Sequence, residues 1–237
     1  MVDINKMNAV ILAGGKGTRI SEYSKKIPKP MVKIKGVPII EYIIQYYEKF
    51  KIKKIYILSG YKSKIIEGHF KKRKNVEVIY SGLYSMTGGR LLYLKNILNN
   101  DFFCTYGDGL STVNLKKLYN NHVKNRKIAT LTAVHPISRF GEVTFRGSSS
   151  TVRQFYEKPN VANDWINGGF FVFQPKIFDF IEGKKSILES DSLKKLASIN
   201  QLNGFKHEDI WHCMDTIRDK EIIEKDVLPK YLRWIKK

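Results

Sequence analysis

A glycine-rich segment near the N-terminus has the residue types of an anion-binding loop. A mainly apolar run over residues 8–13 is followed by Gly14-Gly15-Lys16-Gly17 and then by Thr18 and Arg19. Glycine lets backbone amides approach a phosphate closely, and a guanidinium can hold two phosphate oxygens at once. The segment is neither a Walker A loop nor a dinucleotide fingerprint, because Gly17 and Ile20 stand where those motifs need a hydroxyl residue and a third glycine. It predicts a nucleoside triphosphate site, with a glycine-rich turn that binds nothing as the alternative.

A lysine between two prolines supplies a second cationic point. Lys29 lies in the segment Pro28-Lys29-Pro30. Proline on each side restricts the local backbone, so the ammonium group is presented from a stiff segment. A fixed ammonium suits the neutralisation of charge on a transferring phosphoryl group, and we predict a catalytic role for Lys29. The alternative is a surface lysine in a proline turn.

Two aspartates are candidate ligands of Mg²⁺. Asp108 lies between Gly107 and Gly109, directly after an apolar run, and a carboxylate at a strand end can hold Mg²⁺ on nucleotide phosphates. Asp215, in Met214-Asp215-Thr216, is a possible second oxygen ligand. The alternatives are a turn aspartate for Asp108 and a helix N-cap for Asp215.

Three further segments carry groups that could recognise bases, phosphates or sugars. The segment Thr87-Gly88-Gly89-Arg90 combines backbone donors at a helix start with a cation, which suits a base edge or a phosphate. In Glu157-Lys158-Pro159 the lysine could hold a second phosphate. Asn167 and the Gly168 backbone could bond sugar hydroxyls. Each segment alone is also consistent with a capped helix or a turn.

The bulk composition bounds the class of protein. The 237 residues carry a net charge of +20, 43% hydrophobic residues and two cysteines. The charge is compatible with nucleic acid, with small phosphorylated substrates or with a solvated lysine-rich surface, but no DNA- or RNA-reading motif accompanies it, so we expect no nucleic-acid partner. No apolar run approaches the roughly 18 residues of a membrane span, and we expect a cytoplasmic protein without a signal peptide or a membrane partner. None of the five histidines belongs to a nucleophile motif, so no covalent intermediate is expected.

In the first half of the chain, the elements that position these residues alternate between strand and helix. Apolar runs predict buried strands at residues 9–13, 54–59, 76–80 and 102–106. Helices are predicted from Pro38 onward, at residues 65–70 and from Arg90 to about Leu98. This alternation predicts a Rossmann-like α/β fold, with a mainly parallel central sheet and helices on both faces. Ligands of such sheets lie beyond the carboxyl ends of the strands, so the glycine loop and Asp108 should face one crevice.

The second half has predicted strands that are separated by turns. These strands span residues 129–134, 142–145, 151–156 and 170–173, with a hairpin loop at 147–150. We expect them to add antiparallel strands to the sheet and to form a substrate-side region. Helices are predicted from Pro175, at 193–199 and from 216 to about 226, with a strand at 202–206.

Together these segments resemble the sugar-1-phosphate nucleotidyltransferase superfamily. The resemblance rests on Leu12-Ala13-Gly14-Gly15-Lys16-Gly17-Thr18-Arg19, Pro28-Lys29-Pro30-Met31, Gly107-Asp108-Gly109 and Glu157-Lys158-Pro159. Within the superfamily the chain is most similar to the glucose-1-phosphate cytidylyltransferases, on residues 86–90, 103–109, 139–141, 165–172 and 214–219. The matching segments occur in order along nearly the whole chain.

The resemblance implies one nucleotidyltransferase domain over residues 1–237, with a nucleotide-binding half (about 1–127) and a sugar-phosphate-binding half (about 128–237). It implies that CTP and a sugar 1-phosphate, α-D-glucose 1-phosphate in the closest family, give a CDP-sugar and pyrophosphate with Mg²⁺ as the cofactor. The product would feed the synthesis of deoxysugars for surface polysaccharide. A homo-oligomer is also implied.

The resemblance also implies roles for individual residues. The implied nucleotide-binding set is Leu12, Ala13, Gly14, Gly15, Gly17, Thr18, Arg19, Lys29, Thr87, Gly88, Arg90 and Asp108. Within this set Lys29, Arg19 and Asp108 would be catalytic. Asp108 and Asp215 would hold Mg²⁺. The implied sugar-phosphate-binding set is Glu157, Lys158, Asn167 and Gly168.

Two alternatives and one departure from the family pattern remain open. The chemistry could use dTTP or UTP, or another phosphorylated acceptor. A non-catalytic nucleotide-sugar-binding regulatory subunit is the alternative from another class, although the joint presence of Arg19, Lys29, Asp108 and Asp215 argues against it. Before Trp211 the chain has His207-Glu208-Asp209-Ile210, where the family has a glycine and an aromatic residue. We expect that these two acids could alter the sugar pocket.

Overall fold

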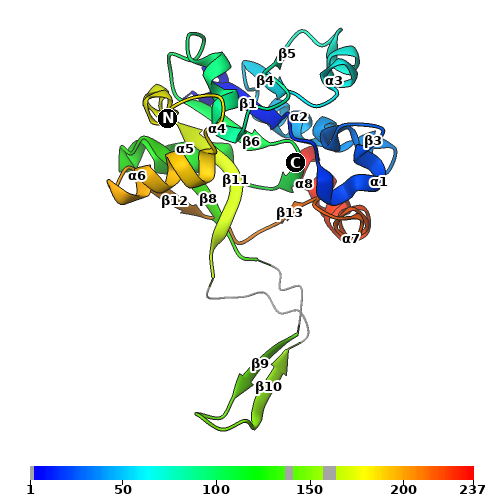
Figure 1. Ribbon diagram of the computed structural model, residues 1–237, viewed down its shortest axis with the longest axis vertical. Coiled ribbons are helices and arrows are strands. Elements are labelled where there is room, and N and C mark those ends of the chain that lie inside the picture. Colours follow the sequence, from blue (N-terminus) through cyan, green and yellow to red (C-terminus); the bar gives the residue numbers. More distant parts are fainter. Residues whose placement is uncertain (1–2, 137–140, 157–163) are drawn as a thin grey trace.

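The computed structural model describes residues 3–136, 141–156 and 164–237. A seven-stranded sheet lies at its centre, with the strand order β12-β8-β11-β6-β1-β4-β5 (Figure 1). These strands are β1 (Asn8–Ala13), β4 (Lys54–Ser59), β5 (Val76–Tyr80), β6 (Phe102–Tyr106), β8 (Ala129–Val134), β11 (Ile166–Phe173) and β12 (Leu202–Lys206). Strands β5, β4, β1 and β6 are parallel, β11 is antiparallel to both β6 and β8, and β12 is parallel to β8. The predicted Rossmann-like sheet is confirmed.

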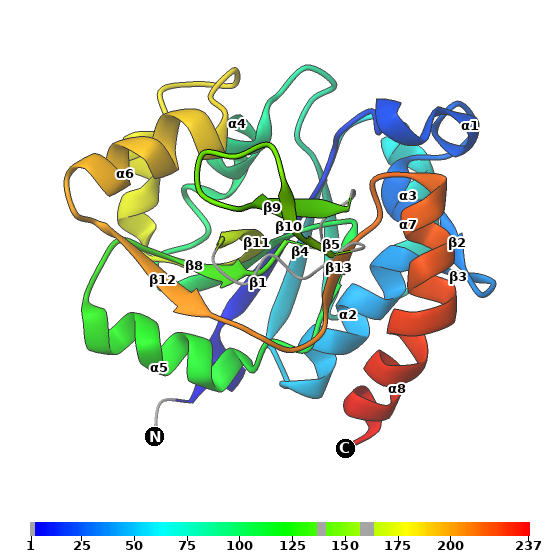
Figure 2. The ribbon, with the colours of Figure 1, turned by 90° about the horizontal axis from the view of Figure 1, so that it is seen from below.

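Alternating side chains bury both faces of this sheet. On β1, Val10 and Leu12 belong to one hydrophobic cluster and Ile11 and Ala13 to the other, because successive side chains of a strand point to opposite faces. One face is covered by α2 (Ile39–Lys49), α5 (Leu115–Asn125) and α8 (Leu228–Lys236), and the other by α4 (Thr87–Leu91), η5 (Pro175–Phe180) and α6 (Lys194–Ser198) (Figure 2). Because both faces are covered, β1 is apolar from Ala9 to Ala13.

Helix α2 shows how a local pattern builds one of these layers. Pro38 precedes the helix, and the residues that follow it at helical spacing are all buried: Ile39, Ile40, Ile43, Ile44 and Tyr47. Burial of each such side chain contributes roughly 1.5–3 kcal/mol before entropy is counted. The helix that the sequence predicts from Pro38 is therefore confirmed, with its apolar stripe against the sheet.

A pair of short strands joins the two halves of the chain at one edge of the molecule. Strand β7 (Gly109–Ser111) follows β6 closely and pairs antiparallel with β13 (Trp211–Cys213). The Met214 amide also donates a hydrogen bond to the Asp108 carbonyl at 2.8 Å. This pairing brings the residues after β6 next to the residues after β13, which the sequence did not reveal.

The remaining elements are short, and η denotes 3-10 or π-helical segments. They are η1 (Ile4–Lys6), η2 (Thr18–Ile20), α1 (Ser21–Ser24), η3 (Lys29–Met31), β2 (Lys33–Ile34), β3 (Val37–Pro38), α3 (Ser63–Phe70), η4 (Leu92–Leu94), η6 (Leu188–Leu193), α7 (Ile217–Ile222) and η7 (Ile223–Val227). Within the described ranges, no helix is long and apolar enough to cross a bilayer.

The antiparallel region departs from the prediction. Strands β9 (Glu142–Phe145) and β10 (Val152–Tyr156) pair with each other and do not join the central sheet. They form a hairpin that extends away from the body of the molecule (Figure 1). The expectation that these strands widen the sheet is therefore wrong, and β11 alone supplies the antiparallel addition next to β6. The alternating pattern of a hairpin does not say what, if anything, the hairpin packs against.

The helices also differ from the prediction in three places: two begin at other residues, and one was not predicted. Helix α4 begins at Thr87, includes both glycines, and ends at Leu91, instead of spanning residues 90–98. The helical segment predicted at 193–199 begins at Leu188 as η6. Helix α5 was not predicted, although Asn114 caps it by accepting hydrogen bonds from two backbone amides of its first turn.

Candidate active site

A cavity of about 520 Å³ lies at the carboxyl ends of β1 and β6. It is lined by most of the predicted site residues: Leu12, Ala13, Gly14, Gly15, Gly17, Thr18, Arg19, Lys29, Thr87, Arg90, Asp108, Asn167, Gly168 and Asp215. Gly88 is buried in α4 and does not line it. Glu157 and Lys158 lie outside the described residues. The glycine loop and Asp108 thus face one crevice, as the parallel sheet requires.

The glycine loop leaves β1 at Ala13 and passes close to Lys29. Gly17 has φ +63°, and a Cβ there would lie 2.9 Å from the Lys29 Cβ. A side chain at position 17 would therefore be strained in its backbone and would displace Lys29. Arg19 lies in the short η2 turn that follows the loop, and its side chain is 72% exposed.

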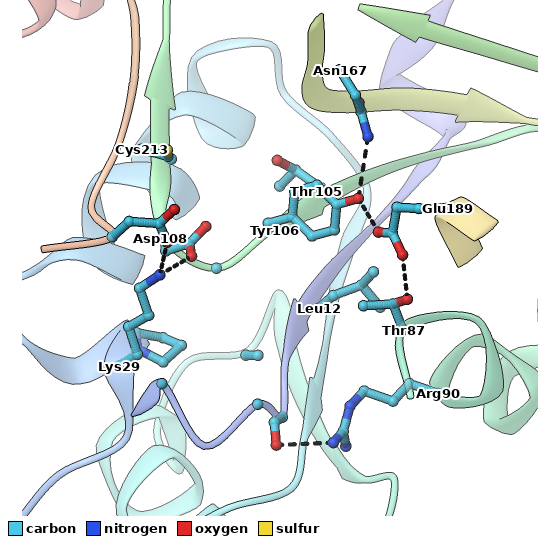
Figure 3. A pocket seen from close by; sticks show the side chains of 18 of the residues that line it. Leu12, Lys29, Thr87, Arg90, Thr105, Tyr106, Asp108, Asn167, Glu189 and Cys213 are labelled. Atoms are coloured by element: carbon cyan, nitrogen blue, oxygen red, sulfur yellow. Dashed lines mark hydrogen bonds and ion pairs between the residues drawn. The ribbon is translucent and has the colours of Figure 1, made fainter. Parts of the chain in front are cut away.

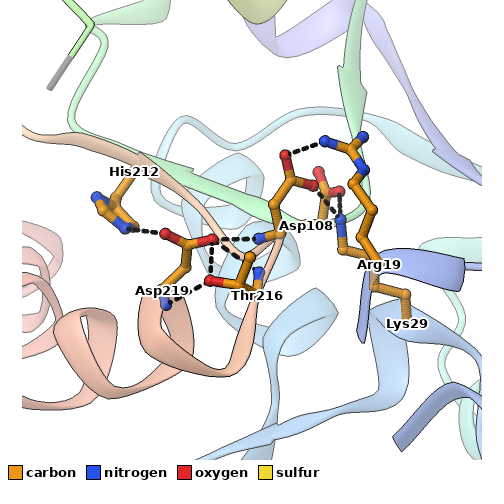
Figure 4. Close-up of polar contacts among 7 residues, drawn as sticks. Arg19, Lys29, Asp108, His212, Thr216 and Asp219 are labelled. Carbon is orange, nitrogen blue, oxygen red and sulfur yellow. Dashed lines mark hydrogen bonds and ion pairs between the residues drawn. The ribbon is translucent and has the colours of Figure 1, made fainter. Parts of the chain in front are cut away.

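Lys29 holds two carboxylates together at one end of the cavity. Its Nζ lies 2.6 Å from Asp108 Oδ2 and 2.7 Å from Asp215 Oδ1, and Arg19 Nη1 lies 2.6 Å from Asp215 Oδ2 (Figure 4). Burial lowers the pKa of Lys29, but Asp108 and Asp215 outweigh burial and raise the pKa above its ordinary value. Its ammonium therefore stays charged at neutral pH.

The carboxylate of Asp219 holds the turn that carries Asp215. Its Oδ2 accepts hydrogen bonds from the Asp215 amide at 3.0 Å and from the Thr216 amide at 2.7 Å (Figure 4). Thr216, not Asp215, is the N-cap of α7, and it forms a capping box with Asp219. The N-cap alternative for Asp215 is therefore wrong, because its side chain turns toward Lys29 and Arg19.

The donor set at this end is compatible with Mg²⁺. Among the described residues, no group of three or more His, Cys, Asp or Glu side chains could hold a metal ion by itself. Mg²⁺, however, is usually held by one or two carboxylates together with substrate phosphates and water. Asp108 and Asp215 share Lys29 as a hydrogen-bond donor, so their carboxylates lie next to each other at one end of the cavity. They fit such a site.

Arg90 lies behind the glycine loop and is 4% exposed. Its Nη2 donates to the Gly14 carbonyl at 2.9 Å (Figure 3). Its Nη1 donates to Ser81 Oγ and to the Gly82 carbonyl, both at 2.8 Å. A Cβ on Gly14 would lie 2.0 Å from Nη1, which explains the glycine. Arg90 therefore ties the start of the loop to the segment after β5. Its expected contact with a nucleotide phosphate stays a prediction.

The tight packing of α4 explains its two glycines. A Cβ on Gly89 would lie 2.1 Å from the Lys184 carbonyl oxygen, and one on Gly88 would lie 3.0 Å from the Ser186 carbonyl oxygen. The Gly89 amide also donates to that Ser186 carbonyl. The glycines thus let the chain before η6 cross α4 at contact distance, a long-range reason that the sequence could not show. A role of Thr87 and Gly88 near a base stays a prediction.

Apart from one carboxylate, the other end of the cavity is built from neutral groups. Strand β11 has an irregular register between Asn167 and Phe171, and such irregularities re-aim side chains. Asn167 Oδ1 accepts from the Gly169 amide at 2.9 Å, and Asn167 Nδ2 donates to Tyr106 Oη at 3.4 Å. Trp211 Nε1 donates to the Gly168 carbonyl at 2.7 Å. Tyr106 and Trp211 are lining residues that the sequence interpretation missed.

Glu189 is another lining residue that the sequence interpretation missed. Its carboxylate accepts hydrogen bonds from Thr87 Oγ1 at 2.7 Å and from Tyr106 Oη (Figure 3). Burial and the neighbouring Glu189 raise the pKa of Tyr106, so this phenol remains a hydrogen-bond donor. Glu189 lies in η6, in a stretch without a motif, and no local signal distinguishes it from a surface glutamate.

The departure before Trp211 does not reach this cavity. Glu208 and Asp209 are exposed and line a separate cavity of about 440 Å³ together with His207 and Ile210. Asp209 accepts a hydrogen bond from the Ile210 amide at 2.8 Å. The expectation that the two acids alter the candidate sugar pocket therefore finds no support in the geometry.

Comparisons with known proteins identify the family of the chain. Residues 8–213 match the family described as Nucleotidyl transferase. A glucose-1-phosphate cytidylyltransferase of Salmonella typhimurium is 39% identical over 245 aligned positions, which cover 92% of this chain and 95% of that protein. A probable glucose-1-phosphate cytidylyltransferase of Bacillus subtilis is 32% identical, over 90% of this chain and 93% of that protein.

Solved structures show the same fold at lower identity. HddC from Yersinia pseudotuberculosis has a TM-score of 0.73 at 23% identity, over 95% of this chain and 99% of that one. A UDP-glucose pyrophosphorylase complexed with UDP-glucose has a TM-score of 0.70 at 17% identity, over 95% and 99% of the two chains. At these identities the likeness is evidence for the fold alone.

Proposed function

Because the chain belongs to the nucleotidyl transferase family and is an enzyme of the glucose-1-phosphate cytidylyltransferase type, we propose that it joins CTP and α-D-glucose 1-phosphate into CDP-glucose and pyrophosphate. The observation that carries this proposal is the position of Lys29, whose Nζ lies within 2.7 Å of both Asp108 and Asp215 and whose side-chain carbons lie beside Gly17 of the glycine loop. Fixed cations and paired carboxylates beside backbone amides suit the transfer of a nucleotidyl group.

The reaction needs no covalent intermediate. An oxygen of the sugar phosphate attacks the α-phosphorus of CTP in line with the leaving group, and the bond from that phosphorus to the oxygen bridging to the β-phosphate breaks. The sugar phosphate is already anionic at neutral pH, so no strong general base is required. Lys29 and Arg19 offset the repulsion between the two polyanions, and positioning supplies much of the remaining rate.

Mg²⁺ belongs to the proposal as the cofactor. Asp108 and Asp215 would hold it, and when bound it would neutralise charge on the triphosphate. The other finer assignments are proposed with it: Thr87 and Gly88 near the cytosine, Arg90 on the nucleotide phosphates, and the sugar phosphate on residues 157–158, Asn167 and Gly168. The identity of the relatives at 32–39% supports CTP and glucose 1-phosphate as the substrate pair.

A pyrophosphate-release assay tests the proposal. Four nucleoside triphosphates are crossed with glucose 1-phosphate and several other sugar phosphates, with and without Mg²⁺. We expect release with CTP and glucose 1-phosphate, and loss of release when the metal is chelated. Pyrophosphate release only with a triphosphate other than CTP, such as dTTP or UTP, would contradict the cytidylyltransferase assignment. Nucleotide binding without release from any pair would favour a regulatory subunit.

The β9–β10 hairpin supports the proposal of a homo-oligomer. Phe145 is 51% exposed and Phe155 63% exposed, on a two-stranded element that is marginal in isolation. Exposed apolar surface of this kind marks interaction sites, and a second copy of the chain is the proposed partner. Light scattering should give a mass above that of one chain, and Phe155→Ser should lower it. Gln154→Ala, on the same strand, is the control that should not. A monomeric wild-type protein would contradict the proposal.

The proposed product is an activated sugar, which would be consumed by enzymes that make deoxysugars for surface polysaccharide. The proposal places this reaction in the cytoplasm. A chromosomal deletion that leaves polysaccharide composition unchanged would contradict the assigned role while leaving the enzymatic proposal intact.

A further inference from the structure

Glu189 brings an acidic group into a cavity whose other end carries Lys29 and Arg19. We infer that the Glu189 carboxylate is a specificity-determining group that accepts a hydrogen bond from an uncharged donor of a bound substrate, either a sugar hydroxyl or the exocyclic amino group of cytosine. The inference rests on the proposed function, since it concerns the substrates of the same cavity.

The carboxylate is fixed in place by neighbours on both sides. Thr87 Oγ1 donates to one carboxylate oxygen at 2.7 Å, and Tyr106 Oη donates to the other. The Leu188 amide donates to Thr87 Oγ1 at 2.9 Å, so the threonine hydroxyl is itself oriented. Asn167 Nδ2 contacts Tyr106 Oη from the far side. A carboxylate held by oriented donors presents its remaining lone pairs in one direction.

The Glu189 oxygens have acceptor capacity left. Each carboxylate oxygen can accept about two hydrogen bonds, and the contacts to Thr87 and Tyr106 use one on each. Glu189 also lines the cavity, so a bound substrate can reach it. Among the described residues, no lysine or arginine forms an ion pair with it at 4.0 Å or less. Its remaining acceptor sites are therefore left for donors that water or a substrate can supply.

The distribution of charge says which part of a substrate meets Glu189. Lys29 and Arg19 lie at the opposite side of the cavity from Glu189 (Figures 3 and 4). Phosphates are attracted to that cationic end and repelled by a carboxylate. The parts of the substrates other than phosphate are uncharged. They carry hydrogen-bond donors, namely the hydroxyls of the sugar and the amino group of the base. A carboxylate accepts well from the cytosine amino group, whereas the uracil carbonyl at the same position offers no donor.

The substitution Glu189→Gln tests the inference with little change in shape. The specificity constant kcat/KM is measured with CTP against UTP at fixed glucose 1-phosphate, and with glucose 1-phosphate against its singly deoxygenated analogues at fixed CTP. Calorimetric binding of the same ligands gives the same ratios without turnover. We expect one of these two discrimination ratios to fall by up to about tenfold, since a hydrogen bond to a charged acceptor is replaced by a weaker one to a neutral amide oxygen. A fall in the CTP to UTP ratio identifies the base as the donor. A fall in the hydroxyl ratio identifies the sugar.

The matched control is Asp191→Asn, which removes a carboxylate from the same η6 turn. Asp191 accepts from the Ile187 amide at 2.7 Å and does not line the cavity. The Asp191→Asn variant should keep both discrimination ratios at the wild-type values. If Glu189→Gln also leaves both ratios unchanged, in binding and in turnover, the inference is wrong, and a uniform loss of activity would show a structural role instead. Failure of the wild-type protein to release pyrophosphate from any pair would count against the proposed function, while the binding ratios would still decide on Glu189.

Discussion

The two ends of the cavity are stabilised by different interactions: ion pairs at one end and mainly neutral hydrogen bonds at the other. At the charged end, Lys29 and Arg19 pair with Asp108 and Asp215 at 2.6–2.7 Å. At the neutral end, amide and hydroxyl groups bond one another or the Glu189 carboxylate, and the Trp211 indole donates to a backbone carbonyl. Charge neutralisation serves any reaction of a nucleoside triphosphate, whereas oriented neutral groups distinguish one substrate from another. The charged end should therefore govern rate, and the neutral end substrate choice.

The largest effect is expected at Lys29. Lys29→Ala leaves Asp108 and Asp215 facing each other without their shared cation, at the proposed phosphate site. We expect kcat to fall about 100-fold or more, and the Kd for CTP to change much less, because the ammonium acts mainly on the transition state. Steady-state kinetics and calorimetry give the two values.

The control for Lys29 is Lys33→Ala. Lys33 is an exposed lysine in the β2 strand that follows the same segment. It should leave kcat unchanged. Near-normal turnover in Lys29→Ala would refute the catalytic role of Lys29 and remove the contrast between the two ends.

A smaller effect is expected at Asp219, which supports the charged end indirectly. Asp219→Asn weakens the hydrogen bonds that hold the Asp215 and Thr216 amides. We expect about a tenfold loss of kcat and a higher Mg²⁺ concentration at half-maximal rate, since bonds to a charged acceptor are worth about 1.5–3 kcal/mol. Glu221→Gln, on the exposed side of the same helix, should change neither value. An unchanged Mg²⁺ requirement in Asp219→Asn would separate Asp219 from the metal site.

The third prediction concerns the neutral end. Trp211→Phe removes the Nε1 donor to the Gly168 carbonyl but keeps an aromatic ring. We expect KM for the sugar phosphate to rise a few-fold, since one neutral hydrogen bond is worth about 1 kcal/mol, with KM for CTP unchanged. Trp234→Phe, on α8 away from the cavity, should leave both KM values unchanged. A loss confined to kcat in Trp211→Phe would contradict the expectation that the neutral end governs substrate choice and the charged end rate.

The smallest effect concerns stability, outside both ends. Burial lowers the pKa of His122 and of His212, so both rings are neutral in the folded protein. The unfolded chain takes up protons on them below about pH 6.5, so their contribution to stability is present above that pH and is lost as the pH falls toward the folded pKa values. The free energy of unfolding, measured in urea between pH 7.5 and 5.5, should fall over this range, and the fall should be smaller in His122→Gln. An equal fall in the variant and the wild-type protein would exclude His122 as a contributor.

Much of the fold and of the charged end could be predicted from the sequence, because the signals are local. The run ending at Ala13, the glycines after it and the Pro-Lys-Pro segment each lie within a few residues. Parallel strands then place the loop and Asp108 at one edge, since carboxyl ends of parallel strands meet there. The position of β9 and β10 could not be predicted in this way, because their strand pattern is satisfied by pairing with each other.

Local sequence thus determined the residue types for phosphate chemistry, the strands that carry them and the parallel sheet. Tertiary structure decided which of those residues meet: Lys29 reaches Asp215 across 186 positions, and Thr87 reaches Glu189 across 102. It also decided why Gly89 must be glycine, through the Lys184 carbonyl that crosses it. The physical reason is that periodicity and turn chemistry act over a few residues, whereas hydrogen bonds and close packing act over a few ångströms between segments that only the folded chain brings together.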